Sequence, residues 1–195
     1  MRLVLASTSK YREFLLKKLG QPFTSVAPDV DESPLLYETA RKRCKRLSIA
    51  KARAVASQFP NSLIIGSDQV AECAGLQLDK PGDYQNCVNQ LRFVRGKALT
   101  FYTGISLYNT STHNLQSACE VYTVHLKTYS EQELQNYIRF DKPFDCAGSF
   151  KAESLGIALF THLEGDDPNT LIGLPLIRLV QFLENEGSGV LADPD

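Results

Sequence analysis

The first twenty residues contain a short apolar strand, a bend rich in hydroxyl groups and an amphipathic helix. Residues 3–5 are typical of a buried strand, and leucines then recur at helical spacing up to a stop at Gly20. Ser7 or Ser9 can cap this helix. The free N–H groups of the first helical turn point at whatever occupies the bend. The segment therefore predicts a binding site for an anion.

The groups around this bend favour phosphate as the anion. The hydroxyls of Ser7 and Ser9 lie in the bend, and the guanidinium of Arg12 follows one turn further along the helix. An ordinary capped helix with a surface arginine explains the same residues equally well. The N-terminal segment alone does not separate the two interpretations.

A second group of polar residues lies further along the chain. Residues 63–65 form an apolar strand that is expected to break at Gly66, which brings Asp68 within reach of solvent and ligand. A turn-forming aspartate after a glycine is the alternative interpretation. Two lysines, Lys51 and Lys80, lie on the predicted helix before this strand and in the loop after it.

Seven short motifs extend from one end of the chain to the other. They are the S-x-S-x-x-R start at Ser7, the pair Asp31-Glu32, Lys51-Ala52, Ser67-Asp68-Gln69-Val70, Lys80-Pro81, Tyr102-Thr103-Gly104 and Asn169-Thr-Leu-Ile-Gly-Leu-Pro175. Each motif alone is weak, but their order resembles that of the Maf family of nucleotide pyrophosphatases. Within that family, the chain is most similar to the bacterial 7-methyl-GTP pyrophosphatase subgroup.

The resemblance implies hydrolysis of the bond between the α- and β-phosphates of a nucleoside triphosphate. This reaction needs a positioned water, neutralisation of the phosphate charges and a group that manages the proton of the water. Asp68, with Glu32 as its helper, either accepts that proton or holds a divalent cation. Carboxylate and phosphate oxygens favour Mg²⁺ or Mn²⁺. The residues expected to bind the phosphates are Ser7, Ser9, Arg12, Lys51 and Lys80.

Three positions distinguish the chain from the pyrimidine-nucleotide branch of the family. Glu153 stands where that branch has a glutamine, and Tyr11 and Gln69 differ as well. Methylation at N7 gives guanine a positive charge, which an aromatic ring and a carboxylate both attract. The three residues therefore favour 7-methyl-GTP as the substrate. The alternatives are the same reaction on dTTP or UTP, and a nucleotide-binding regulator of cell division without turnover.

The periodicity of the chain predicts one α/β domain with a mixed sheet and two lobes around a nucleotide-binding cleft, similar to Maf and inosine-triphosphatase proteins. The domain is expected over 1–187, with a flexible tail over 188–195. Helices are expected over 38–59, from Pro81 or Tyr84 to Val94, from Ser130 to Arg139 and over 168–186. Strands are expected over 63–70, 100–108, 119–128 and 156–163, with a hairpin turn over 109–114.

Composition limits the partners and the compartment. The formal charge of −1 provides no global basic field for a long nucleic acid, so we expect a small nucleotide as the partner. The basic run over 41–46 is expected to be the solvated flank of a helix rather than a nucleic-acid surface. Neither a membrane span nor a signal peptide is visible, so a cytoplasmic protein is expected. The family resemblance allows a homodimer.

The spacing of the cysteines and histidines excludes the usual zinc and disulfide patterns. Five cysteines are scattered without a C-x-x-C pair, and the three histidines are isolated in the sequence. We therefore expect reduced thiols and no structural zinc. These cysteines and histidines are Cys44, Cys73, Cys87, Cys119, Cys146, His113, His125 and His162.

Overall fold

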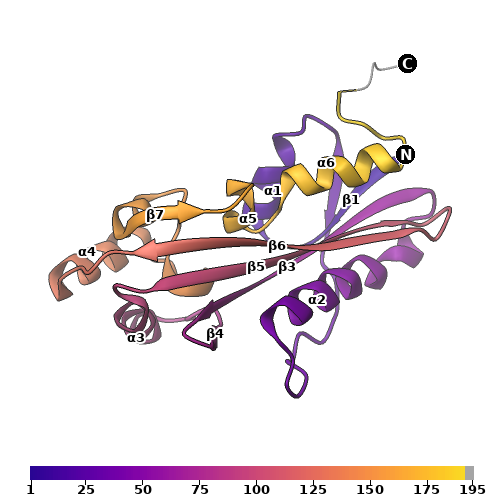
Figure 1. Cartoon of the computed structure of the whole chain (residues 1–195). Helices are drawn as coiled ribbons and strands as arrows, with labels where there is room; N and C mark the ends of the chain where they lie inside the picture. The colour runs from indigo at the N-terminus through magenta and orange to yellow at the C-terminus, as the bar shows by residue number, and fades with distance from the viewer. Residues whose placement is uncertain (192–195) are drawn as a thin grey trace.

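The computed structural model describes residues 1–191, and within that range the strands form one seven-stranded mixed sheet in the order β2-β1-β3-β5-β6-β7, with β4 paired to β3 (Figure 1). The strands are β1 (Arg2–Ala6), β2 (Phe23–Val26), β3 (Ser62–Cys73), β4 (Leu76–Leu78), β5 (Ala98–Asn109), β6 (Leu115–Leu126) and β7 (Phe160–Glu164). The helices are α1 (Lys10–Lys17), α2 (Ala40–Ala54), α3 (Tyr84–Val94), α4 (Glu131–Asp141), α5 (Pro168–Ile172) and α6 (Leu176–Asn185). This architecture confirms the predicted α/β class.

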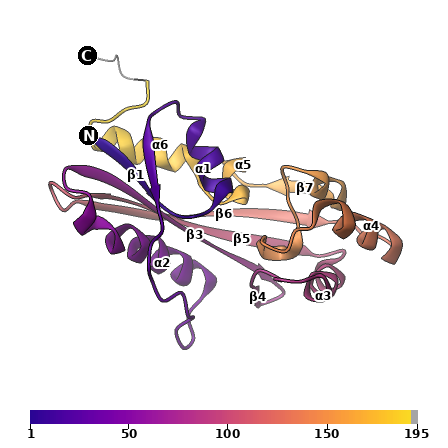
Figure 2. The same cartoon turned by 180° about the vertical axis from the view of Figure 1, so that it is seen from behind.

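The three long strands β3, β5 and β6 cross the whole molecule and belong to both lobes (Figures 1 and 2). In one lobe, α2 packs on one face of the sheet, and α1 and α6 pack on the other. The alternation of side chains along β1 explains this division, because Leu3 and Leu5 contact α1 and α6 while Val4 and Ala6 contact α2. The other lobe packs α3 and α4 around a separate apolar cluster.

The middle of β3 has an open edge. The first part of β3 pairs in parallel with β1 as far as Ala6 opposite Gly66, and antiparallel pairing with β4 starts only at Ala71 opposite Leu78. Residues 67–70 therefore have β5 on one side and neither β1 nor β4 on the other. This gap between two neighbouring strands is where the two lobes leave a cleft.

The predicted break at Gly66 is wrong, because β3 continues through Gly66 to Cys73. The glycine is needed for close packing rather than for a turn. A Cβ atom at Gly66 would lie 2.0 Å from the backbone oxygen of Ser48 on α2, and one at Gly104 on β5 would lie 2.1 Å from the oxygen of Cys44. The two glycines let α2 approach the sheet closely, which brings the last turn of α2 next to Asp68.

We expect Gly66→Ala to lower the free energy of unfolding by about 3 kcal/mol, because the added methyl group forces α2 away from the sheet. Urea unfolding measures this change. Gly104→Ala should have an effect of the same size, since its Cβ meets the same helix. An unchanged unfolding midpoint in both variants would contradict this explanation of the close packing.

Several predicted elements are confirmed. Helix α3 spans Tyr84–Val94 as expected, with Asp83 as its cap, so Pro81 precedes the helix instead of starting it. Ser130 and Glu133 form the predicted capping box of α4, which ends at Asp141. The strands β5 and β6 form the expected hairpin. Ser9, one of the two candidate caps, accepts a hydrogen bond from the Arg12 amide at the start of α1.

Three predicted elements are shorter or divided. The helix expected over 38–59 ends at Ala54 and is followed by a 3₁₀ turn over Ala56–Gln58. The strand expected over 156–163 begins with a 3₁₀ turn, so β7 starts only at Phe160. The helix expected over 168–186 is two helices, because Gly173 adopts a φ of 117° and Pro175 follows it.

The other expectations concern cysteines, the C-terminal tail and membrane association. All five cysteines are free thiols, and Cys44 and Cys119 bring their sulfur atoms within 3.2 Å of each other. Val190 of the expected tail packs against the cluster that includes α6, and residues 192–195 lie outside the described residues. None of the helices between residues 1 and 191 combines the length and apolar character that crossing a bilayer requires.

Candidate active site

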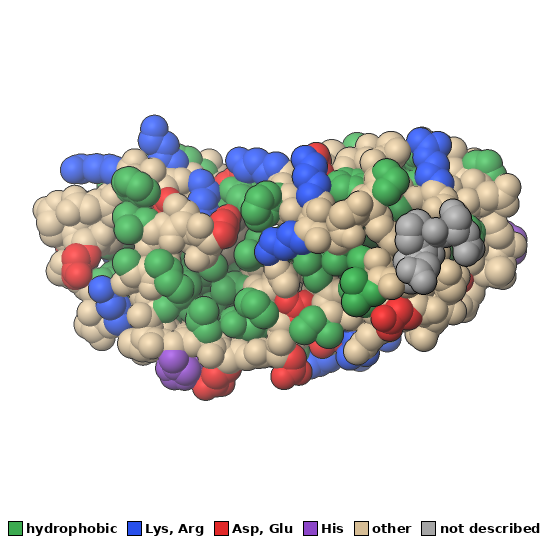
Figure 3. Space-filling view, turned by 90° about the horizontal axis from the view of Figure 1, so that it is seen from above, with side chains coloured by type: hydrophobic (Ala, Val, Ile, Leu, Met, Phe, Trp, Pro, Cys, Tyr) green, Lys and Arg blue, Asp and Glu red, His purple; other side chains and the backbone are tan. Residues whose placement is uncertain are grey.

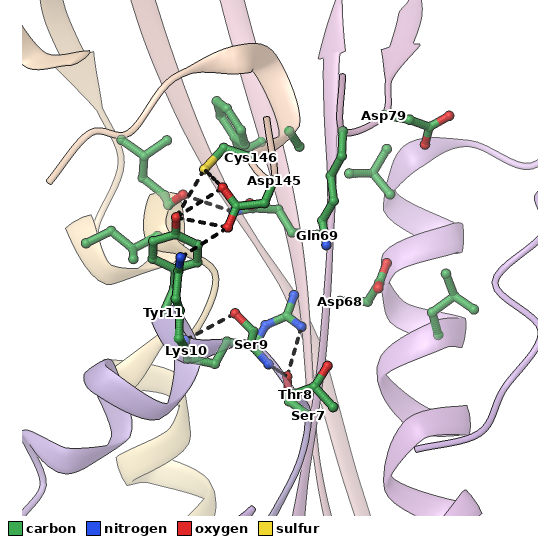
Figure 4. A pocket seen from close by; sticks show the side chains of 18 of the residues that line it. Ser7, Thr8, Ser9, Lys10, Tyr11, Asp68, Gln69, Asp79, Asp145 and Cys146 are labelled. Carbon is green, nitrogen blue, oxygen red and sulfur yellow. Dashed lines mark hydrogen bonds and ion pairs between the residues drawn. The ribbon is translucent and has the colours of Figure 1, made fainter. Parts of the chain in front are cut away.

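A cavity of about 620 Å³ opens beside the unpaired stretch of β3. Lys10, Tyr11, Asp145 and Cys146 lie on one side of it, and Asp68 and Asp79 lie on the other (Figure 4). Every predicted site residue contributes to its wall: Ser7, Ser9, Tyr11, Arg12, Glu32, Lys51, Asp68, Gln69, Lys80 and Glu153. The fold therefore brings together residues that are spread over most of the sequence.

A buried lysine between two carboxylates forms the centre of the cavity. Nζ of Lys51 lies 2.7 Å from Oδ1 of Asp68 and 2.8 Å from Oε1 of Glu32. The side chains of Lys51 and Asp68 are only 7% and 9% exposed. Burial alone would raise the pKa of Glu32, but the hydrogen bond and charge of Lys51, with the charges of Lys80 and Arg12, lower it overall. The cluster thus places two carboxylates beside one desolvated lysine side chain.

The position of Asp68 follows from the alternation of β3. Gly66 faces α2, so Asp68, two residues later, faces α2 and Lys51. Ser67 and Gln69 point to the opposite face, where the Ser67 hydroxyl donates to the backbone oxygen of Gly173 at 2.9 Å. The aspartate is therefore a residue within a strand, and the interpretation as a turn former is wrong.

The N-terminus of α1 provides the second part of the site. The Ser7 hydroxyl accepts hydrogen bonds from the Ser9 amide at 3.1 Å and from Nη1 of Arg12 at 3.4 Å. Nε of Arg12 donates to the oxygen of Gly173 at 2.9 Å, which fixes the guanidinium above the bend. Burial lowers the pKa of Arg12, while the carboxylates of Asp68 and Glu32 oppose that change. The arrangement gathers hydroxyl groups and a guanidinium at the N-terminus of α1, where the sequence predicts an anion site.

A cation missed in the sequence completes the positive lining. The basic run over 41–46 was interpreted as solvated, which is wrong for Arg43, because its side chain is only 13% exposed and lines the cavity. Nη2 of Arg43 donates to the backbone oxygen of Glu32 at 3.3 Å. Among residues 1–191, Nε of Arg43 is buried and has no hydrogen-bond partner. The helical period of α2 could have indicated this position of Arg43. Arg43 and Lys51 lie eight residues apart, a spacing that keeps two residues on the same side of a helix.

The far wall of the cavity combines an aromatic ring with acidic groups. The Tyr11 hydroxyl donates to Oδ2 of Asp145 at 3.2 Å, and Nζ of Lys10 lies 3.4 Å from the same oxygen. The ammonium of Lys10 also lies 5.1 Å from the centre of the Tyr11 ring. Burial raises the pKa of the Cys146 thiol to about 12, with a contribution from the charge of Glu153. The Cys146 thiol is therefore neutral at pH 7.

Asp145 is a site residue that the sequence did not single out, although it begins the stretch that contains Glu153. Glu153 is exposed at the rim of the cavity.

The amide of Gln69 donates to Thr103 and to the backbone oxygens of Thr170 and Leu171, at 2.9–3.1 Å. These bonds tie Gln69 to α5 as well as to the cavity.

The donor set suits a hard divalent cation. Within residues 1–191, Oδ2 of Asp68 and Oε2 of Glu32 accept no hydrogen bond, so each carboxylate keeps an oxygen free for a ligand. Mg²⁺ is commonly bound through one or two carboxylates together with phosphate oxygens. The residues present therefore fit such an ion.

Comparisons with known proteins show which proteins the chain is similar to. A family model described as Maf-like protein matches residues 2–186. The 7-methyl-GTP pyrophosphatase of Colwellia psychrerythraea is 49% identical over 191 residues, which cover 98% of this chain and 96% of the relative. The enzyme of the same name from Vibrio cholerae is 50% identical over 190 residues, covering 97% of this chain and 98% of the relative.

Two solved structures share the fold at low sequence identity. The Ham1 protein of Staphylococcus aureus superposes with a TM-score of 0.53 at 15% identity, covering 95% of this chain and 100% of that chain. A HAM1 protein from Coxiella burnetii superposes with a TM-score of 0.51 at 14% identity, covering 95% of this chain and 99% of that chain. At such identities the likeness shows the fold alone.

Proposed function

This chain belongs to the Maf family, and on that basis we propose that it hydrolyses the bond between the α- and β-phosphates of a nucleoside triphosphate, with 7-methyl-GTP as its preferred substrate. The products are the nucleoside monophosphate and pyrophosphate. Relatives that share about half of its residues over nearly its whole length carry the name 7-methyl-GTP pyrophosphatase. The observation that carries the proposal is the Asp68–Lys51–Glu32 cluster facing the N-terminus of α1 in one cavity.

In this proposal, the cations and the helix terminus bind the triphosphate. Arg12 and the hydroxyls of Ser7 and Ser9 hold one end, while Lys51 and Lys80 neutralise charge near the carboxylates. Desolvation strengthens the interactions of Lys51, because the side chains of Lys51 and Asp68 are only 7% and 9% exposed, while that of Glu32 is 56% exposed. The residues thus place the phosphates before the reaction and stabilise the charge that develops during it.

Asp68 is proposed as the proton acceptor for the attacking water. Its Oδ1 is held by Lys51, so the free Oδ2 is the atom that takes the proton. In the alternative role, Asp68 and Glu32 would hold Mg²⁺ or Mn²⁺ through their free oxygens, and the ion would supply positive charge beside the phosphates. The Lys51 contact keeps both carboxylates directed at the same point.

The aromatic and acidic wall is proposed to bind the base. Lys10 already places a cation against the ring of Tyr11 and the carboxylate of Asp145, so this wall attracts positive charge. The methylated guanine is cationic, and an aromatic face contributes about 0.5–2 kcal/mol to binding such a group. A hydrogen bond to a charged carboxylate contributes about 1.5–3 kcal/mol. Glu153, at the rim, is placed to add a second carboxylate.

A panel of nucleotides tests the proposed substrate. We expect kcat/KM for pyrophosphate release with Mg²⁺ to be highest for 7-methyl-GTP, ahead of GTP, dTTP, UTP, CTP and ATP. If dTTP or UTP leads, the reaction stands but the proposed base recognition fails. If no nucleotide is hydrolysed with either Mg²⁺ or Mn²⁺, the chain is a binding protein and not a pyrophosphatase.

We expect Glu153→Gln to reduce the preference for 7-methyl-GTP over GTP by about tenfold, because the amide lacks the charge that the methylated base attracts. The measurement is the ratio of the two kcat/KM values. Glu13→Gln is the matched control, since Glu13 pairs with Lys17 outside the cavity. Equal loss of activity on both nucleotides would rule out a role for Glu153 in selectivity.

A further inference from the structure

Three potential metal ligands lie together on β6 and β7, outside the nucleotide cavity. They are His125, His162 and Glu164, and one ligand atom from each lies within 4.8 Å of the other two. In the space-filling view, a histidine lies beside an acidic side chain at the edge of the molecule (Figure 3). The histidines are isolated in the sequence, but the pairing of β6 with β7 brings His125 and His162 together.

The strand pairing explains why these side chains meet. His125 on β6 lies directly opposite His162 on β7 in the antiparallel register, so both rings project from the same face of the sheet. Glu164 follows His162 by two residues and therefore shares that face. The two imidazole rings stack with their centres 3.8 Å apart and their planes 13° from parallel.

The polar atoms of the three residues converge on one point. Oε1 of Glu164 lies 2.9 Å from Nε2 of His162 and 3.2 Å from Nε2 of His125. The second contact lacks the geometry of a hydrogen bond, and within residues 1–191 Nε2 of His125 is a buried polar atom without a partner. Buried polar atoms almost always have a hydrogen-bond partner. A buried imidazole nitrogen without one, next to a second imidazole nitrogen and a carboxylate oxygen, therefore points to a metal ion as the missing partner.

The donor types identify the kind of ligand. Two imidazole nitrogens and one carboxylate oxygen form a set that borderline divalent ions such as Zn²⁺ prefer, with water at the fourth position. We propose that His125, His162 and Glu164 bind a divalent transition-metal ion, best matched by Zn²⁺, at a second site separate from the nucleotide cavity.

The proposed ion would join the edge strand β7 to the long strand β6. The contact between β6 and β7 shifts register between His125 and Leu126, so the regular ladder is interrupted where the ion would bind. Strand β7 leads directly into α5, and backbone oxygens of α5 and of Gly173 hold Gln69 and Arg12. Metal binding therefore stabilises the segment that supports one side of the nucleotide site.

Titration of the 195-residue chain with Zn²⁺ alone tests the proposal. We expect one equivalent to bind by calorimetry and the thermal midpoint to rise with Zn²⁺ concentration, because the ion binds the folded state. His162→Ala and Glu164→Gln should each weaken binding by at least about tenfold. His113→Ala is the matched histidine control, because His113 contacts Tyr108 elsewhere, and it should leave the affinity unchanged.

Two further measurements separate this site from other ligands in the chain. Asp68→Asn should bind Zn²⁺ as tightly as the wild type, because the nucleotide cavity is not involved. Co²⁺ in place of Zn²⁺ should give an absorption spectrum without a thiolate charge-transfer band, which excludes the Cys44 and Cys119 pair. Unchanged affinity in both His162→Ala and Glu164→Gln, loss of binding in Asp68→Asn, or a thiolate band would each overturn the proposal. Without Zn²⁺ in the assay, pyrophosphate release by His162→Ala with Mg²⁺ is expected to equal that of the wild type, because the second site is then empty in both proteins.

Discussion

Asp68→Asn is expected to lower kcat/KM for 7-methyl-GTP by about a thousandfold, because the amide cannot take the proton of the attacking water. The same change removes the charge that pairs with Lys51 at 2.7 Å. Steady-state pyrophosphate release measures the loss. The side chain keeps its size, so the variant should retain the fold, and a thermal unfolding curve checks that it does.

Asp79→Asn is the matched control for this variant. Asp79 also lines the cavity, but its side chain is 82% exposed and its nearest cation, Nη1 of Arg43, lies 3.6 Å away. An exposed ion pair contributes little, so kcat/KM should change by no more than about threefold. Equal losses in Asp68→Asn and Asp79→Asn would mean that the cavity needs negative charge in general rather than a specific proton acceptor.

Lys51→Met is expected to lower kcat/KM by about a hundredfold or more, because it removes a desolvated positive charge beside the phosphates. Lys51 also holds Asp68 and Glu32 together, and its loss leaves two carboxylates close to each other without their shared partner. Kinetics with 7-methyl-GTP at saturating Mg²⁺ measure the effect. Lys51→Arg keeps the charge but changes the geometry, so its activity should lie between those of the wild type and Lys51→Met.

The pH dependence provides an independent check on Lys51. In the wild type, Lys51 is the main group that holds the pKa of Glu32 below its usual value against the opposing effect of burial. The ion pair therefore contributes stability above the pKa of the unfolded chain, and this contribution is lost as the pH falls through the lower pKa of the folded protein. In Lys51→Met, the main group that lowers the pKa of Glu32 is gone, so this pKa rises relative to the wild type. The acid limb of the plot of activity against pH should then move to higher pH in Lys51→Met. If this limb stays where it is in the wild type, Lys51 is not the group that lowers the pKa of Glu32.

Local patterns in the sequence were sufficient for much of the fold. The leucine period and the hydroxyl cap predicted α1, and the capping box predicted α4, because both signals depend on residues within one or two helical turns. The alternating and β-branched residues of β5 and β6 likewise predicted their hairpin. These elements form where neighbouring residues already specify the backbone conformation.

The errors arose where distant contacts decide the structure. Gly66 appeared to break a strand, but its role depends on the backbone of α2, which lies 18 residues earlier at Ser48. Arg43 appeared solvated because its partners, Glu32 and Gln77, lie outside α2, in a loop and in β4. The pairing of His125 with His162 depends on the register of two strands separated by a helix. Local propensity contains no information on such contacts.

The segment 169–175 was identified in the sequence only through family resemblance, and the structure supplies a physical reason for it. The backbone oxygen of Gly173 accepts hydrogen bonds from Arg12 and from Ser67. The oxygen of Thr170 accepts from Gln69 and Thr103. The segment therefore positions the candidate phosphate ligand Arg12 through its backbone, which residue-by-residue chemistry could not predict.

The most direct test of the central claim is the identity of the products that the wild type and Asp68→Asn form from 7-methyl-GTP with Mg²⁺. Separation by ion-exchange chromatography should show equal amounts of 7-methyl-GMP and pyrophosphate from the wild type, and no more than traces from the variant. Formation of 7-methyl-GDP and phosphate would place the cleavage at the wrong bond. The same products at the same rate from Asp68→Asn would show that the Asp68–Lys51–Glu32 cluster is not the catalytic centre.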